Sequence, residues 1–194
     1  MVMFLIRKPT RAYIDRFIES SRVLPLSYVP VGTVSDDSPG YDRDETVAAI
    51  GRGPSDLERA RAALRTWKHF EVGWVEVWPS AAGTATGTIV GVLIHHLGFW
   101  SLNGCRVVYE VDGGGTEARF GFAYGTLPNH AEAGEELFEV WLDRSRGEVM
   151  YRIRAASHPR AALARVGYPI ARMLQARFRR DSVAAMKRAV ESRA

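Results

Sequence analysis

Residues 118–127 read ARFGFAYGTL, and this stretch decides the fold because its side chains alternate in size with a period of two. Successive side chains of a β-strand point to opposite faces, so one face of this strand is bulky and the other is nearly bare. The bulky face holds Phe120, Phe122, Tyr124 and Thr126, and the bare face holds Gly121, Ala123 and Gly125. Because glycine weakens a strand interior, the bare face predicts a close approach by another element, either the long C-terminal helix or a ligand.

The same period of two extends from this strand in both directions, over residues 73–156. Turn-forming residues divide the region into about six strands, with breaks at 79–87, 98–104, 112–115, 128–134 and 143–147. Strands joined by short turns pair only as antiparallel neighbours. The sequence therefore predicts a meander or a strongly curved antiparallel sheet.

Helical patterns flank the predicted sheet. One helix is expected at residues 11–20, inside an extension that covers residues 1–40. After a short strand at 44–52, a second helix begins at Ser55 or Asp56. Its apolar stripe is Leu57, Ala60, Leu64 and Trp67.

Two helical pieces follow the predicted sheet, at residues 159–166 and 169–191, because a proline stands at the start of each and Gly167 separates them. In the longer piece, one face holds Ile170, Leu174, Phe178, Ala185 and Ala189. This order of elements is that of the helix-grip fold, an α+β architecture. In that fold a curved antiparallel sheet, here of about six or seven strands, wraps a long C-terminal helix and leaves a cavity between them. We expect one domain over residues 1–194, with the extension of residues 1–40 packed on it.

Charge and cysteine content limit the partners of this chain. Of its 194 residues 25% are charged, and the net charge is +4. Residues 159–194 carry nine Lys or Arg and two Asp or Glu, so the basicity belongs to the C-terminal segment. Arg165, Arg172 and Arg179 lie seven apart, away from Ile170 and Leu174, as on a solvated face. Nucleic acid is therefore an unlikely partner, although an interaction module with a basic C-terminal helix remains an alternative.

Location in the cytoplasm is expected, because the single cysteine cannot form an internal disulfide. The apolar run at residues 2–6 is far too short to enter a membrane. The excess of arginine over lysine is typical of a G+C-rich genome, and we expect a bacterial source. The sequence does not predict an oligomeric state.

Few residues suggest catalysis or cofactor binding. Cys105 lies in an apolar alternation, where a buried thiol is inert. Loop 126–136 carries His130, Glu132, Glu135 and Glu136, whose spacing fits no metal motif. No phosphate-binding loop or nucleophile elbow is present, so we predict no cofactor and no metal, and assign no catalytic residue.

The predicted cavity suggests a site for a small apolar or amphipathic molecule. Gln175 and Ser182 lie near the apolar stripe of the long helix, where each either bonds the sheet or orients a ligand. The Arg106 side chain is either exposed or binds an anion at the rim of the predicted cavity. The candidate ligand-binding residues are Arg106, Tyr109, Tyr124, His130, Glu135, Gln175, Phe178 and Ser182.

The alternative is an enzyme, similar to a hydrolase or cyclase, that uses the same cavity. In that interpretation His130, Glu132 or Glu135 acts as acid or base. Arg106 or Tyr124 would then stabilise an anionic intermediate. This interpretation requires that these side chains meet within hydrogen-bonding distance around a pocket.

Several strings together resemble DUF1990, a family of domains of unknown function found in bacteria and plants. These are Gly-Arg-Gly at 51–53, Trp67 with Gly-Trp at 73–74, CRVVY at 105–109, FGFAYGTLP at 120–128 with His130, GEE at 134–136, GYP at 167–169, Gln175, and Ala-Met at 185–186. The resemblance covers nearly the whole chain and brings no known catalytic residue. In layout it is similar to the wider group of START and birch-pollen-allergen-like ligand carriers, which implies a helix-grip fold.

Overall fold

The computed structural model describes residues 3–35, 39–113, 119–159 and 168–192. Within these ranges eight strands form a single antiparallel sheet with the order β2-β8-β7-β6-β5-β4-β3, and the short β1 pairs with β5. The strands are β1 (Met3–Leu5), β2 (Asp42–Arg52), β3 (Val75–Trp78), β4 (Ile89–His96), β5 (Phe99–Gly113), β6 (Arg119–Thr126), β7 (Glu132–Asp143) and β8 (Glu148–Pro159). The predicted curved antiparallel sheet is confirmed.

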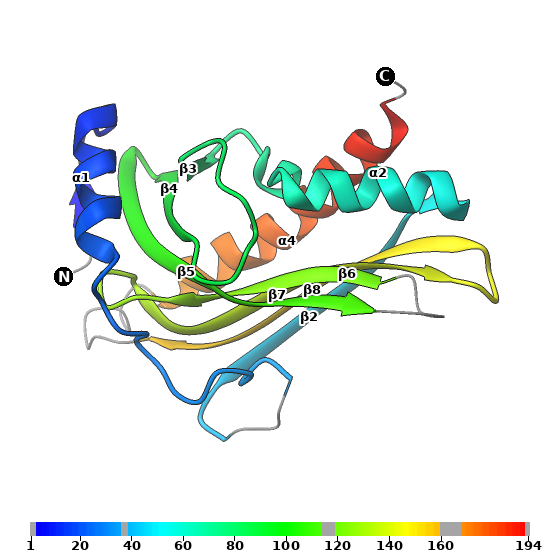
Figure 1. Ribbon diagram of the computed structural model, residues 1–194. Coiled ribbons are helices and arrows are strands. Elements are labelled where there is room, and N and C mark those ends of the chain that lie inside the picture. Colours follow the sequence, from blue (N-terminus) through cyan, green and yellow to red (C-terminus); the bar gives the residue numbers. More distant parts are fainter. Residues whose placement is uncertain (1–2, 36–38, 114–118, 160–167, 193–194) are drawn as a thin grey trace.

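The helices lie against one face of this sheet and at one of its ends (Figure 1). They are α1 (Arg11–Ser21), α2 (Gly53–Arg65), the short 3-10 helix η1 (Lys68–Phe70) and α4 (Tyr168–Glu191). Helices α2 and α4 run across the sheet, which curls around them, whereas α1 stands beside β4 and β5. The helix expected at 159–166 lies outside the described residues. No helix in the described ranges is long and apolar enough to cross a lipid bilayer.

The bulky face of β6 is the one that meets the helices, and we call this side of the sheet the concave face. Phe120, Phe122 and Tyr124 join one large buried cluster with residues of α2 and α4. Burial of a large apolar side chain contributes roughly 1.5–3 kcal/mol, so this cluster supplies much of the stability of the fold. Cys105 is fully buried on the same face, and burial raises the pKa of its thiol.

The bare face of β6 is covered by a different element from the one expected. A Cβ atom added at Gly125 would collide with the Tyr28 hydroxyl, and one added at Gly121 would collide with Glu139. Tyr28 belongs to the N-terminal segment, residues 22–35, which crosses this convex face of the sheet. The expectation of the C-terminal helix or a ligand at this face is therefore wrong, because the chain itself fills the space.

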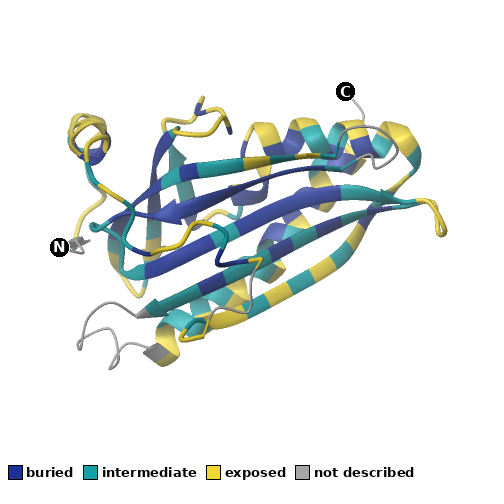
Figure 2. Cartoon of the chain, turned by 60° about the horizontal axis from the view of Figure 1, so that its bottom comes forward, coloured by how far each residue is buried: buried dark blue, intermediate teal, exposed yellow. Residues whose placement is uncertain are grey.

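Hydrogen bonds fasten the N-terminal segment to the convex face. The Arg106 guanidinium donates to the backbone carbonyls of Arg22 and Leu24, at 3.0 and 2.7 Å. The backbone N–H of Ser27 donates to the carbonyl of Thr126 at 2.9 Å. Figure 2 turns this side forward and shows that residues along the central strands are buried here.

The predicted apolar face of α4 is confirmed in large part, since Leu174, Phe178 and Ala189 pack against the core and Ala185 is buried. Ile170 is the exception at 41% exposed, and Ser182, Met186 and Val190 are buried as well. In the first half of the helix, polar side chains also face the sheet. Arg172 and Arg179 bind Asp44 of β2 rather than solvent, and Nη1 of Arg179 lies 3.2 Å from Oδ2 of Asp44. The prediction that both arginines are solvated is wrong, since β2 supplies a carboxylate beneath them.

Candidate ligand site

His69 is the most unusual buried side chain on the concave side. It lies in η1, directly after Trp67, whose left-handed backbone (φ 58°) turns the chain out of α2. Its imidazole is 0% exposed, and within the described residues neither ring nitrogen has a hydrogen-bond partner. Burial lowers the pKa of His69 to about 3, so the ring is neutral and carries one N–H donor and one acceptor.

Aromatic side chains surround His69 on several sides. We call Trp67, Phe70, Phe122, Tyr124, Phe138 and Phe178 the ring cluster. The His69 ring stacks on Trp67 at 5.7 Å between centroids and lies 4.5 Å from Phe138. Phe178 of α4 closes the cluster, 4.8 Å from Phe70. An unpaired polar ring in these apolar surroundings costs roughly 1–3 kcal/mol for each unsatisfied group.

A carboxyl group borders the ring cluster at Tyr124. Tyr124 and Glu136 face each other across β6 and β7, and the Tyr124 hydroxyl donates to Oε2 of Glu136 at 2.5 Å. Burial raises the pKa of Glu136 to about 7, although the bond from Tyr124 opposes this shift. Near neutral pH this carboxyl group is therefore present in both its protonated and ionised forms.

A second carboxyl group, Glu132, lies on the same strand and faces α4. The Gln175 amide donates to both carboxylate oxygens, at 2.9 and 2.7 Å, and the Ser157 hydroxyl donates at 2.8 Å. Burial raises the pKa of Glu132 too, against the effect of these bonds. Deeper along α4, the Ser182 hydroxyl lies 2.9 Å from that of Tyr151.

The predicted site residues fall into separate groups. Tyr124, Gln175, Phe178 and Ser182 lie between the concave face and α4. Arg106, Tyr109 and Glu135 lie on the convex face. The Glu135 carboxylate, on a residue only 2% exposed, accepts from the Tyr28 hydroxyl, the Tyr109 hydroxyl and the Gly32 N–H, at 2.7, 2.8 and 2.9 Å. These three residues therefore hold the N-terminal segment.

The side chains named for an enzyme converge only in part, since Glu132 and Tyr124 lie on the concave side and the others do not join them. His130 Nδ1 accepts the backbone N–H of Glu132 at 3.0 Å, in the loop before β7. Arg106 and Glu135 lie behind the sheet, opposite Tyr124. No group of three or more potential metal ligands occurs within the described ranges.

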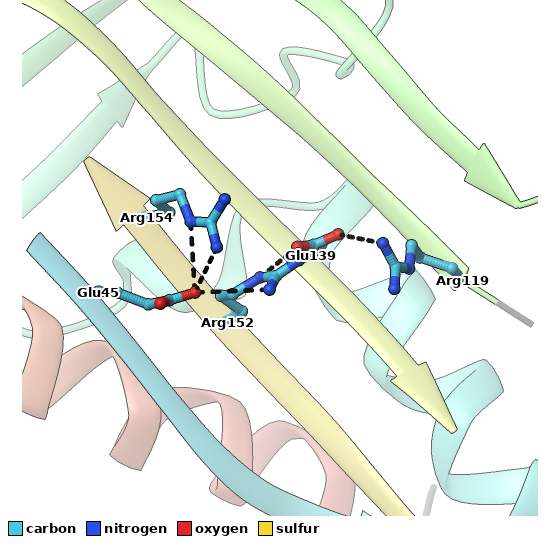
Figure 3. A network of polar contacts seen from close by, with 5 residues as sticks. All are labelled: Glu45, Arg119, Glu139, Arg152 and Arg154. Atoms are coloured by element: carbon cyan, nitrogen blue, oxygen red, sulfur yellow. Dashed lines mark hydrogen bonds and ion pairs between the residues drawn. The ribbon is translucent and has the colours of Figure 1, made fainter. Parts of the chain in front are cut away.

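A further charged network occupies the convex face (Figure 3). It joins Glu45, Arg119, Glu139, Arg152 and Arg154 across β2, β8, β7 and β6. Glu139 is 1% exposed and binds two of these arginines. Its charge is thereby compensated, so this network serves the sheet, while Nε of Arg119 is buried without a hydrogen-bond partner among the described residues.

The fold and this interior place the protein in a class. An antiparallel sheet curled around a terminal helix defines the helix-grip fold. Solved structures with this fold include the allergen Ara h 8.0201 (TM-score 0.50, 12% identity, 79% of this chain and 100% of that chain). The Zhui aromatase/cyclase from a Streptomyces strain has a TM-score of 0.51 at 16% identity, over 78% of this chain and 94% of that chain. At these identities the likeness concerns the fold alone.

The particular family follows from sequence comparison. The model of DUF1990, described as a domain of unknown function, matches residues 27–185, so the chain belongs to that family. A UPF0548 protein of Dictyostelium discoideum is 32% identical over 209 residues, covering 98% of this chain and 97% of the relative. One of Deinococcus radiodurans is 34% identical over 200 residues, covering 96% and 98%. Because relatives occur in eukaryotes too, family membership does not support the expected bacterial source.

Sequence reasoning missed His69 and the role of Glu136. His69 lies in a three-residue helix, which is too short to show a periodic pattern. The signal that was present is its position between Trp67 and Phe70, where a polar residue interrupts a buried aromatic run. Glu136 was noted only as part of a loop. It belongs to β7, on the face that meets α4.

Proposed function

We propose that this protein binds a small, largely apolar or amphipathic molecule between the concave face of the sheet and α4. The observation that supports this proposal is His69. A buried imidazole without a hydrogen-bond partner is costly, and one polar group of a ligand would satisfy it. The ring cluster would hold the apolar body of that ligand, as in small-molecule sites lined by aromatic side chains with a few polar groups.

Four of the residues expected from the sequence belong to this proposal. Phe178 would contact the apolar body, and polar groups would come from Tyr124 of β6 and from Gln175 and Ser182 of α4. The enzyme alternative, with His130, Glu132 or Glu135 as acid or base and Arg106 or Tyr124 at an anionic intermediate, has less support. Of these residues Arg106 and Glu135 lie on the convex face, and only Glu132 and Tyr124 share the concave side. A nucleic-acid partner for α4 also has less support, because two of its arginines bind Asp44.

We also propose that the protein works in the cytoplasm. Its only cysteine, Cys105, is buried and unpaired. Such a residue needs no oxidising compartment.

Native mass spectrometry tests the binding proposal. The full chain, purified from the cytoplasm of the cells that make it, should carry an additional mass that disappears on unfolding. Phe178→Ala should lower the occupancy, because loss of a buried aromatic side chain removes about 1.5–3 kcal/mol of apolar contact. Gln175→Ala should instead change which molecule is retained, since a site with a polar partner rejects analogues that lack the matching group.

The matched control is Phe99→Ala, the same change at a ring that is 47% exposed in the turn region of β4 and β5. It should keep the bound mass of the wild type. Circular dichroism separates loss of ligand from loss of fold in each variant. An unliganded wild type, or a Phe178→Ala protein with unchanged occupancy, would contradict the proposal.

A further inference from the structure

Glu132 and Glu136 are partly buried acids without a cationic partner among the described residues, and we call them the acidic pair. Among the described residues their hydrogen-bond partners are neutral: the Tyr124 hydroxyl for Glu136, and the side chains of Gln175 and Ser157 for Glu132. Neither forms an ion pair with a described residue. The nearest guanidinium groups, those of Arg172 and Arg179, bind Asp44.

The charges of the described residues at this interface do not balance when both acids are ionised. The carboxylates of Asp42, Asp44, Glu132 and Glu136 then face the guanidinium groups of Arg172 and Arg179. An unpaired charge is costly away from water, so the free protein keeps a proton on the acidic pair instead. A cation would balance the charge and displace that proton.

The ring cluster next to Glu136 is suited to a cation. Tyr124 lies 5.5 Å from Phe138, 6.2 Å from Phe70 and 6.4 Å from Trp67, measured between ring centroids. Aromatic faces attract ammonium groups electrostatically. The cation–π contacts of the described side chains involve Trp74, Trp100, Phe120 and Trp141, so these rings next to Glu136 carry no cation of the protein.

His69 provides a second acceptor near the same rings. Its ring is neutral, and its unprotonated nitrogen can accept an N–H from a ligand. The His69 ring and the Tyr124 ring both contact Phe138, at 4.5 and 5.5 Å. A carboxyl group, a neutral imidazole and aromatic rings are therefore linked in one contiguous set of side chains.

We infer that the ligand is an organic amine, bound as its ammonium form, with the charged nitrogen at Glu136 and an aromatic or apolar body against the ring cluster. This inference rests on the proposed function and adds the chemical class of the ligand. The ammonium replaces the proton on Glu136: the carboxylic acid loses its proton to solvent, and the carboxylate then pairs with the cation. No covalent bond to carbon forms or breaks.

Proton release makes the binding depend on pH. The titratable and charged groups facing Glu136 are Tyr124 from β6, Glu132 from β7, Asp44 from β2, Cys105 from β5, Tyr151 from β8 and Arg179 from α4. Burial raises the pKa of the two tyrosines and the cysteine, which therefore stay neutral. With Glu136 about half ionised near pH 7, the affinity for an ammonium should rise roughly tenfold from pH 6 to pH 8.

Isothermal titration calorimetry with three probes that share a phenylethyl body tests the inference on the full chain. The probes are 2-phenylethylammonium, the neutral 2-phenylethanol and the anionic 3-phenylpropionate. At pH 8 we expect the affinity for the ammonium to be at least about tenfold higher than that for the alcohol, and the affinity for the anion to be the lowest. Titrations of the ammonium in two buffers of different ionisation enthalpy should show proton release at pH 7.

Two matched variants assign the effect to Glu136. Glu136→Gln should abolish both the preference for the ammonium and the proton release. Glu135→Gln makes the same change at the adjacent residue on the opposite face, and it should keep both. Loss of the preference in both variants would contradict the assignment to Glu136.

The outcomes separate this inference from the proposed function. Equal affinity for ammonium and alcohol, or tighter binding of the anion, would contradict the inference that the ligand is an amine. The proposal that the protein binds a small molecule would still hold. Absence of binding by every probe, together with an unliganded protein in the native mass spectrum, would contradict the proposed function itself. A cellular ligand whose mass and fragmentation pattern show no basic nitrogen would also contradict the inference that the ligand is an amine.

Discussion

At position 69 the chain buries an imidazole whose two nitrogens have no partner within the described structure. Replacing it with leucine, of similar volume and without polar atoms, should raise the unfolding free energy of the free protein by about 1 kcal/mol. The same variant should retain less of the cellular ligand. Urea unfolding and native mass spectrometry measure the two effects.

His95→Leu is the control for this prediction, because His95 is exposed and stacks on Trp100. It should change stability by no more than about 0.5 kcal/mol and leave the ligand in place. A His69→Leu protein that is less stable and still fully liganded would show that the imidazole serves packing alone.

At the scale of single residues, the sequence identified side-chain chemistry better than side-chain direction. Tyr124 and Tyr109 were both expected at the ligand, and each donates a hydrogen bond to a glutamate of β7. The two bonds lie on opposite faces, because Glu135 and Glu136 are consecutive residues of a strand. An irregularity in the β5–β6 pairing between Val107 and Tyr109 shifts the register, and no local pattern reveals it.

At the scale of elements, the bare face of β6 is explained by the N-terminal segment. Gly125→Ala should loosen this segment, because the added methyl group would collide with the Tyr28 ring. We expect a stability loss of about 1–3 kcal/mol, and faster amide hydrogen exchange confined to residues 22–35. Gly83→Ala is the matched control, since a Cβ atom there meets nothing within 4 Å. Exchange that rises equally in the concave-side helices would contradict a local role.

The long helix shows which parts of an orientation the sequence predicts. Period and turn signals fix the strands and helices, because they depend on neighbouring residues, and the apolar stripe of α4 correctly marks Leu174, Phe178 and Ala189 as facing the core. The polar contacts of the same helix depend on Asp44, more than 120 residues earlier in the chain. Arginine spacing alone predicts a solvated face, whereas a partly buried carboxylate beneath Arg172 and Arg179 reverses that preference.

At the scale of the whole molecule, one helix covers the curved sheet. In this protein both apolar and ionisable groups lie beneath that helix. The second half of α4 buries Ser182, Met186 and Val190, and this part stabilises the fold. The first half faces Asp44 and the acidic pair. In the proposed function, stability and ligand recognition are divided along one helix, and the stability of the molecule should report the protonation of the acidic pair.

The pH dependence of unfolding tests this division. The pKa of Glu136 is raised from 4.5 to about 7 on folding, so between these pH values the native state binds more protons than the unfolded state. Stability from this group is therefore present below pH 4.5 and is lost as the pH rises to about 7. Relative to Glu136→Gln, the wild type should lose on the order of 2–3 kcal/mol between pH 4.5 and pH 8 in urea unfolding. Added 2-phenylethylammonium should restore part of that loss at pH 8 and little at pH 5, because only the ionised carboxylate pairs with the cation. Parallel pH profiles of the unfolding free energy for wild type and variant would mean that ionisation of Glu136 does not destabilise the folded protein. The argument for a cation at Glu136 would then fail.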